Sequence, residues 1–177
     1  MKFELKDICF FDCETTGVPA KGLKWDADFM QFPQVVQLAW SVSDKEKSYI
    51  IKPDGYEIPE ETTEIHGITT ERAIAEGVPF AVVVDEFLAD AADAPLVCAH
   101  NIYFDTSMLK ANILRWCGRE YYDAKAEDAL HKGKRIDTMM KCIKFVGALF
   151  ANGRPGKFPT LEELYNKLFP GETFPAH

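Results

Sequence analysis

The alternation of apolar and polar residues predicts that the first third of the chain consists mainly of strands. Residues 8–11 are an apolar run of strand length that ends at a Thr-Thr-Gly turn. Residues 35–42 and 47–51 are two further strand-like segments, and the polar stretch 43–46 between them has the composition of a hairpin turn. Residues 18–34 have no sustained period and are expected to form a loop. The sheet is therefore expected to begin with antiparallel strands.

The rest of the chain combines one buried strand with several helices. Residues 96–99 are a short apolar run, whereas residues 53–77 are polar and rich in turn formers, with one helical turn expected at 69–73 after a threonine cap. Helical spacing and stop signals predict helices at 80–88, at 106–117, after Asp137 and at 161–169. Because strands come first and then alternate with helices, the pattern predicts an α/β fold with a mixed sheet.

Length and composition are those of one globular domain. The chain has 177 residues, of which 47% are hydrophobic and 27% charged, close to the averages of globular proteins. The first residues are too charged for a signal peptide, and no apolar run approaches the ~18 residues of a membrane span. Five cysteines without Cys-x-x-Cys spacing favour free, buried thiols. We therefore expect a single domain over residues 1–177, in a cytoplasmic protein without a membrane partner.

The charge balance restricts how such a domain could bind nucleic acid. A formal net charge of −8 argues against a broad basic face that grips long nucleic acid non-specifically. It leaves room for a local site, because an acidic cluster that holds divalent cations presents positive charge to a phosphate.

Two acidic residues lie at the C-terminal end of the first predicted strand. Asp12 and Glu14 alternate on that strand, so their side chains project to one side with alpha carbons ~7 Å apart. Carboxylate pairs of this kind bind magnesium or manganese, and two such ions ~4 Å apart stabilise both oxygens of a phosphodiester exchange. Asp105 follows the strand at 96–99, in the first turn of a helix, and is either a third carboxylate of the site or a dipole-stabilising residue. Each pattern alone is also an ordinary feature of strand ends and helix starts.

Three motifs together resemble the DEDD (DnaQ-like) 3′→5′ exonucleases, in their histidine-bearing DEDDh branch. The motifs are Phe-Asp-x-Glu-Thr-Thr-Gly at residues 11–17, Ile-His-Gly-Ile-Thr at residues 65–69 and His-Asn-x-x-Phe-Asp at residues 100–105. Their order and spacing match, and the similarity extends from about residue 7 to the end of the chain. The family includes the proofreading epsilon subunit of bacterial DNA polymerase III.

The resemblance implies a ribonuclease-H-like fold with a central mixed five-stranded sheet flanked by helices, and the removal of nucleotides from 3′ ends. Two Mg²⁺ or Mn²⁺ ions would be held by Asp12, Glu14 and Asp105. The substrate would be a single-stranded or frayed 3′ end of DNA, with RNA as the less favoured alternative, and a DNA polymerase subunit is a candidate partner. The residues that would contact the terminal nucleotide are Thr15, Thr16, Gly17, Glu61, His66 and Asn101.

The last motif of this branch is a histidine followed about five residues later by an aspartate. The approach to His177 resembles that motif, so His177 would be the general base, a role that suits a pKa near neutrality. An ordinary terminal histidine is the other interpretation. The fourth carboxylate would follow His177 on a final helix, which residues 1–177 are expected to lack. Asp137 is interpreted as a helix cap rather than as its substitute.

Two other classes of function stay open at this stage. One is a catalytically impaired module of the same fold that binds nucleic acid or nucleotides, which the missing fourth carboxylate favours. The other is a nucleotidase or related phosphoesterase that acts on mononucleotides. Within the exonuclease interpretation, proofreading, DNA repair and RNA trimming are not separated, because contacts around the 2′-hydroxyl group cannot be located.

Overall fold

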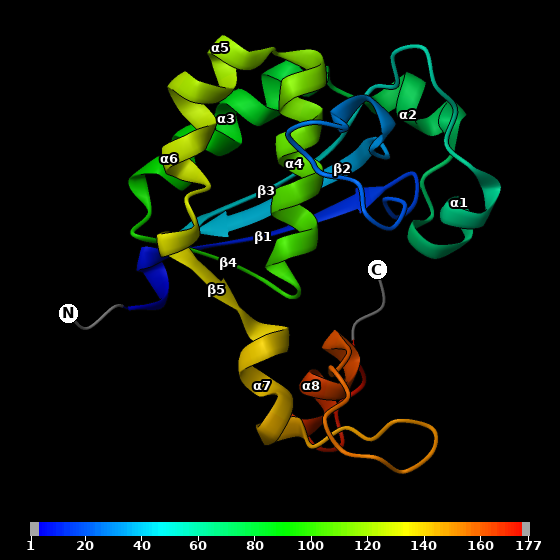
Figure 1. Ribbon diagram of the computed structural model, residues 1–177, viewed down its shortest axis with the longest axis vertical. Helices are drawn as coiled ribbons and strands as arrows, with labels where there is room; N and C mark the ends of the chain where they lie inside the picture. Colours follow the sequence, from blue (N-terminus) through cyan, green and yellow to red (C-terminus); the bar gives the residue numbers. More distant parts are fainter. Residues whose placement is uncertain (1–3, 175–177) are drawn as a thin grey trace.

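The computed structural model describes residues 4–174, so the expectation for His177 lies outside the described residues. Five strands form one sheet in the order β3-β2-β1-β4-β5 (Figure 1). β1 is antiparallel to β2 and parallel to β4, which is parallel to β5. The expected mixed five-stranded sheet is therefore confirmed. Its strands are β1 (Ile8–Thr15), β2 (Val35–Val42), β3 (Lys45–Ile50), β4 (Leu96–Ala99) and β5 (Arg135–Asp137).

All the α-helices come after β3, and β4 and β5 lie among them in the chain. Figure 1 shows α3 and α4 on one side of the sheet, α1 and α2 beyond the C-terminal end of β1, and α7 and α8 apart from these layers, after β5. The α-helices are α1 (Glu60–His66), α2 (Thr70–Glu76), α3 (Phe80–Asp93), α4 (Ile102–Trp116), α5 (Arg119–Tyr121), α6 (Glu127–Ala129), α7 (Thr138–Val146) and α8 (Leu161–Leu168). Shorter elements are the 3-10 turns Leu5–Asp7, Phe29–Gln31 and Lys132–Lys134 and the π-helical segment Tyr122–Ala126.

The core forms where α3 and α4 pack against the sheet. Phe87 of α3 is fully buried and its ring contacts the rings of Phe11 on β1 and Trp40 on β2. Met108 and Ile113 of α4 are also fully buried. The alternation on β1 is regular, with odd-numbered residues buried against the helices and even-numbered ones on the other face. The period of two seen in the sequence thus decides which β1 side chains leave the core.

Two helical regions were not predicted from the sequence. α1 lies within the polar stretch 53–77 and has only Thr62 buried, so it shows no apolar period. Its boundaries are instead marked by Pro59 before it and by Gly67 after it, which has the left-handed φ of 72° common at helix ends. The segment 119–129 is the other region. α4 also begins at Ile102, four residues earlier than its apolar spacing indicated.

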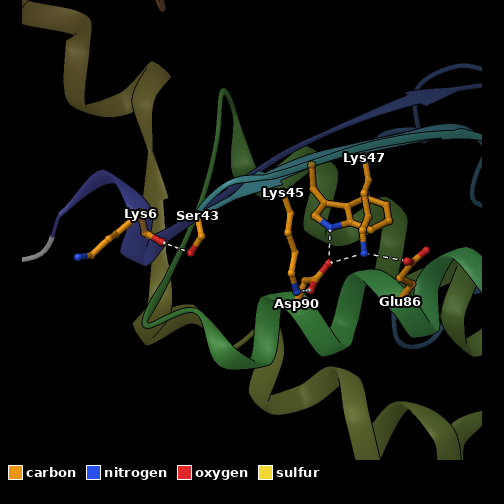
Figure 2. Close-up of polar contacts among 7 residues, drawn as sticks. Lys6, Ser43, Lys45, Lys47, Glu86 and Asp90 are labelled. Carbon is orange, nitrogen blue, oxygen red and sulfur yellow. Dashed lines mark hydrogen bonds and ion pairs between the residues drawn. The ribbon is translucent and has the colours of Figure 1, made fainter.

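A buried carboxylate joins α3 to the β2–β3 hairpin at the edge of the sheet far from the C-terminal end of β1. Figure 2 shows Asp90 of α3, which is 8% exposed, accepting hydrogen bonds from the Trp40 indole at 3.0 Å and from the amines of Lys45 at 2.6 Å and Lys47 at 3.0 Å. Lys47 also pairs with Glu86 at 2.7 Å. Four contacts therefore fix the β2–β3 hairpin to α3.

The cysteines and the helix lengths bear on two expectations drawn from the composition. The five cysteines are free thiols, and Cys9, Cys13 and Cys98 are buried, as expected. Between residues 4 and 174, no helix combines the length and the apolar character that a membrane crossing requires.

Candidate active site

Asp12 and Glu14 lie on the same face of β1. Cys13 between them points into the core and is 6% exposed, whereas Asp12 is exposed and Glu14 is partly buried. The pairing of β1 with β2 shifts in register between Glu14 and Thr15, an irregularity that often redirects side chains beside functional sites. Asp12 also borders a hollow of about 390 Å³ on this open face of the sheet, which Phe10 and Ser41 help to line. The predicted carboxylate pair is therefore present at an accessible surface.

Asp105 brings a third carboxylate to this strand from the helical side. It lies in the first turn of α4 and is 2% exposed. Its Oδ1 atom accepts a hydrogen bond from the Cys13 amide at 3.1 Å, the backbone group between the two other acidic residues. This approach is a consequence of topology, because β4 is the parallel neighbour of β1 and α4 starts directly after it. Asn101 makes the sharp turn between them with a φ of 71°, a conformation that asparagine tolerates better than most residues.

The electrostatics of Asp105 show that the three carboxylates influence one another. Burial and the charge of Asp12 raise the pKa of Asp105 to about 8, although the hydrogen bond from the Cys13 amide partly opposes them. The charge of Glu14 acts in the same direction. Burial first, and the neighbouring negative charge second, therefore disfavour the ionised form of the Asp105 carboxyl group.

This donor set fits hard divalent cations. All three groups offer carboxylate oxygens, which magnesium and manganese prefer, and a cation would relieve the charge repulsion that raises the Asp105 pKa. Within residues 4–174, however, no group of three or more His, Cys, Asp or Glu side chains is arranged to hold a metal ion. The carboxylates are thus gathered as a charged cluster rather than as a complete set of metal ligands.

The Thr15-Thr16-Gly17 turn is held firmly at the end of β1. The Thr15 hydroxyl donates to the Gly17 carbonyl at 2.7 Å. The Thr16 amide donates to the Gln34 carbonyl at 2.9 Å, and the Thr16 hydroxyl accepts from the Gln34 amide at 2.9 Å. Thr16 therefore uses both its amide and its hydroxyl to shape the turn, and its expected contact with the terminal nucleotide stays a prediction.

His66 connects the end of α1 to the same turn. Its Nδ1 atom accepts a hydrogen bond from the Ile68 amide at 3.1 Å, so the neutral ring carries its proton on Nε2. This Nε2 atom is buried, and among the described residues it has no hydrogen-bond partner of regular geometry. Burial lowers the pKa of His66, while the neighbouring backbone of Thr15 has the opposite effect. A buried donor beside the Thr-Thr-Gly turn is thus the feature of His66 that a nucleotide contact would use.

Three further residues singled out in the sequence, namely Glu61, Asn101 and Asp137, lie on α1, before α4 and before α7. Glu61 is exposed in the first turn of α1, and its expected contact with the terminal nucleotide stays a prediction. The backbone amide of Asn101 donates to the Asp137 carboxylate at 3.3 Å. Asp137 also accepts from the Met140 amide at 3.1 Å, which confirms its interpretation as the N-cap of α7.

His100 has a structural role that sequence reasoning did not identify. Its Nε2 atom lies 2.9 Å from the Pro159 carbonyl, which can only accept, so Nε2 carries the proton. Its Nδ1 atom lies 3.1 Å from the Thr138 hydroxyl. His100 therefore joins the end of β4 to the start of α7 and to the segment before α8. Its place in the motif was the only signal in the sequence, because its partners are 38 and 59 residues away.

Comparisons with known proteins agree with this arrangement. The chain is similar to exonuclease I of Methylocaldum szegediense (TM-score 0.66, 19% identity), covering 96% of this chain and 37% of that one. It is also similar to Escherichia coli exonuclease I in complex with a dT13 oligonucleotide (TM-score 0.64, 22% identity), covering 90% and 35%. The chain thus spans little more than a third of these proteins, and at such identities the likeness shows the fold alone, which is ribonuclease-H-like. No curated protein sequence matches the chain.

The family assignment comes from the sequence model. Residues 9–170 match the model of the family RNase_T, described as exonuclease. The matched range includes all of β1 except Ile8, the start of α4 and every described carboxylate of the candidate site. The chain therefore belongs to the RNase_T exonuclease family.

Proposed function

We propose that this domain removes nucleotides one at a time from the 3′ end of single-stranded or frayed DNA, by hydrolysis that depends on two Mg²⁺ or Mn²⁺ ions. The observation that carries the proposal is the position of Asp105, whose buried carboxyl group lies against the backbone between Asp12 and Glu14. Three carboxylates from two parallel strand ends are an arrangement suited to phosphodiester chemistry. Membership of the exonuclease family supports the same class of reaction.

Each carboxylate has a distinct place in this proposal. Asp12 is exposed on β1 and would contact both ions, Asp105 would hold one of them from the α4 side, and Glu14 would position the attacking water. Divalent cations bound there would supply the positive charge that phosphoryl transfer requires. The Asp105 carboxyl group must lose its proton to become a metal ligand. Cation affinity should therefore rise with pH until the pH reaches the pKa of Asp105, about 8.

The other roles follow from the resemblance to the histidine-bearing branch. His177 would take the proton of the attacking water, and a fourth carboxylate beyond it would complete the ligand set. The Thr15-Thr16-Gly17 turn, Glu61, His66 and Asn101 would hold the terminal nucleotide, with the buried Nε2 donor of His66 as the feature that favours such a contact. Like the epsilon subunit of DNA polymerase III, a cytoplasmic protein of this kind would serve in proofreading beside a polymerase.

DNA is favoured over RNA as the substrate. Exonuclease I of Escherichia coli, which has the same fold, has been crystallised with dT13 and with dA16. An RNA substrate would instead require specific contacts to the 2′-hydroxyl group. A direct comparison of matched DNA and RNA oligonucleotides tests this preference.

The assay uses a 5′-fluorescein-labelled dT20 oligonucleotide with Mn²⁺. The wild-type protein should produce a ladder of labelled products that shorten one nucleotide at a time, which also reports the direction. Asp12→Asn and Asp105→Asn should each slow the first cleavage by about 100-fold or more, because each removes a charge that the cations need.

Asp137→Asn is the matched control. Asparagine caps helices as well as aspartate does, so this variant should keep both α7 and activity. Wild-type rates for Asp12→Asn would refute the assignment of the site.

The second candidate is a nucleic-acid-binding module without turnover. It is favoured by the absence, within residues 4–174, of a complete group of metal-holding side chains. Binding of dT20 by the wild-type protein without any shortening in Mn²⁺ would support this candidate and refute hydrolysis.

A further inference from the structure

Positive charge is concentrated in one stretch of an otherwise acidic chain. Residues 131–160 contain seven of the 20 Lys and Arg residues but only one of the 28 Asp and Glu residues, a balance of +6 in a chain with a net charge of −8. This stretch includes β5, α7 and the loop that leads to α8. The segregation is the opposite of an evenly solvated surface, so the contacts of these cations are informative.

Some of these cations stabilise the fold. The Lys134 amine donates to the carbonyls of Ala91 and Ala92 at the end of α3, and the Arg135 guanidinium donates to the Leu130 carbonyl. Lys157 pairs with Glu163 at 2.6 Å.

Three others lie on α7 and the following loop and are exposed. These are Lys141, Lys144 and Arg154. They are the cations of this stretch that a ligand near α7 could reach.

Large apolar side chains are exposed on the same two segments, α7 and the loop that follows it. No residue of α7 is fully buried, and on its outer side Met140 is 51% and Phe145 50% exposed. Lys141 and Lys144 are three residues apart and so share that side of the helix. In the loop, Phe150 is 49% exposed and its amide donates to the carbonyl of Arg154 at 2.9 Å, which places these two residues in one tight turn. We call these six residues the α7 surface: Met140, Lys141, Lys144, Phe145, Phe150 and Arg154.

The α7 surface is attached to the edge of the sheet that carries the candidate site. α7 begins directly after β5, whose residue Asp137 pairs with Ala99 at the end of β4, just before α4 and Asp105. His100 bonds to both Thr138 and Pro159, so the start of α7 and the end of the loop are fixed at the same point. In Figure 1 these elements extend away from the sheet beyond β5. Single-stranded DNA whose 3′ end lies at the carboxylates would pass α7 if it left the site on this side.

We infer that the α7 surface binds the single-stranded DNA that lies upstream of the 3′ terminal nucleotide. Exposed aromatic rings stack on bases irrespective of sequence, and neighbouring Lys and Arg residues neutralise the backbone phosphates. A protein partner fits less well, because lysine is depleted from the cores of protein interfaces, whereas two of the six residues of this surface are lysines. The inference rests on the proposed function, since it adds a second contact to the same substrate.

The test measures affinity and turnover separately. Binding of 5′-fluorescein-labelled dT20 is followed by fluorescence anisotropy in Ca²⁺, without Mg²⁺ or Mn²⁺, across a salt series. The double variant K141E/K144E should bind about tenfold or more weakly, with a shallower dependence on salt, because two phosphate contacts are lost. Phe145→Ala should weaken binding about fivefold or more without changing the salt dependence, because it removes stacking only. Hydrolysis of the dinucleotide pdTpdT, which is too short to reach α7, should be unchanged in both variants.

The matched control is K6E/K132E. It changes the net charge equally, but both lysines precede the N-terminal ends of β1 and β5, whereas α7 follows the C-terminal end of β5. Equal weakening in this control, or wild-type dT20 affinity in both α7 variants with unchanged thermal melting, would overturn the inference. A change in sedimentation from dimer to monomer without a change in dT20 affinity would also overturn it and assign the surface to self-association. Failure of the proposed function is a different result, namely no shortening of dT20 by the wild-type protein.

Discussion

At the scale of single residues, Asp105 is the group whose environment is furthest from that of a carboxyl group in water. It is almost fully buried, and its pKa is about 8 because of burial and the charge of Asp12. Such a group lowers the stability of the domain in the absence of a cation, and strongly perturbed carboxyl groups of this kind cluster at functional sites. The contrast with Asp90 is instructive, since that buried carboxylate is surrounded by cations and an indole donor.

The first prediction concerns the pH dependence of stability in EDTA. The folded-state pKa of Asp105 lies above its unfolded value of about 3.9, so its favourable contribution is complete below pH 4 and is lost as pH rises toward 8. Asp105→Asn lacks this term but can still accept from the Cys13 amide. Relative to wild type, the variant should gain up to about 4 kcal/mol of unfolding free energy between pH 5 and pH 8. Urea unfolding at these two values measures it, and parallel curves for the two proteins would contradict it.

At the scale of secondary-structure elements, the site is built from two neighbouring segments, the end of β1 and the start of α4 after β4. The sequence predicted four of the five strands, the helix that carries Asp105 and the α7 cap, because alternation, turn residues and capping residues are local signals. It did not predict α1, whose exposed polar surface has no apolar period, or the roles of His100 and Asp90, whose partners are 38 to 59 residues distant. Carboxylate convergence was predictable in outline, since parallel neighbouring strands end at the same edge. The buried Nε2 atom of His66 was not, because burial is decided by tertiary packing.

The second prediction concerns the attachment of α3 to the hairpin. Burial alone would raise the pKa of Asp90, but hydrogen bonds from Lys45, Trp40 and Lys47 outweigh it and lower the pKa to about 2. Its folded-state pKa is thus depressed, so this contribution is present above pH 4 and lost as pH falls from 4 toward 2. Asp90→Ala should lower the unfolding free energy by about 2 kcal/mol at pH 7, and by less near pH 2.

The control for Asp90 lies on the same helix. Asp85 pairs with Lys125, but both side chains are about half exposed, so Asp85→Ala should lower the unfolding free energy clearly less than Asp90→Ala does. Chemical denaturation of both variants at pH 7 and pH 2.5 provides the comparison. Equal losses in the two variants would show that the hairpin contact contributes no more than an ordinary surface pair.

At the scale of the whole molecule, the protein is an acidic domain with one basic projection. Its family membership establishes an exonuclease domain, and the exonuclease I structures with the same fold are nearly three times as long. The charge cluster on β1 and α4 and the cations of the α7 surface are therefore two regions of opposite sign near one edge of the sheet. A bound cation would change the first region from repelling a phosphate to attracting it.

The third prediction follows for the intact domain. Mn²⁺ at about 100 times its dissociation constant should stabilise the folded state by about 2.7 kcal/mol and raise Tm by about 5–10 °C. Asp105→Asn should lose most of this shift, whereas Asp137→Asn should keep it. Differential scanning fluorimetry with and without EDTA measures the effect. Equal shifts in wild type and Asp105→Asn would place the bound ion elsewhere.

The hydrogen bond between Cys13 and Asp105 also has a consequence for how the protein forms. The two partners are 92 residues apart in the chain. β2, which pairs with β1, lies between them and is synthesised well before β4. Closing so long a loop carries an entropic cost that local hairpin contacts do not. The β1–β2–β3 meander can therefore assemble early, while the cluster of carboxylates forms only once β4 and α4 have been made. A nascent chain would carry Asp12 and Glu14 on a preformed sheet without yet being a nuclease, so activity appears late in folding.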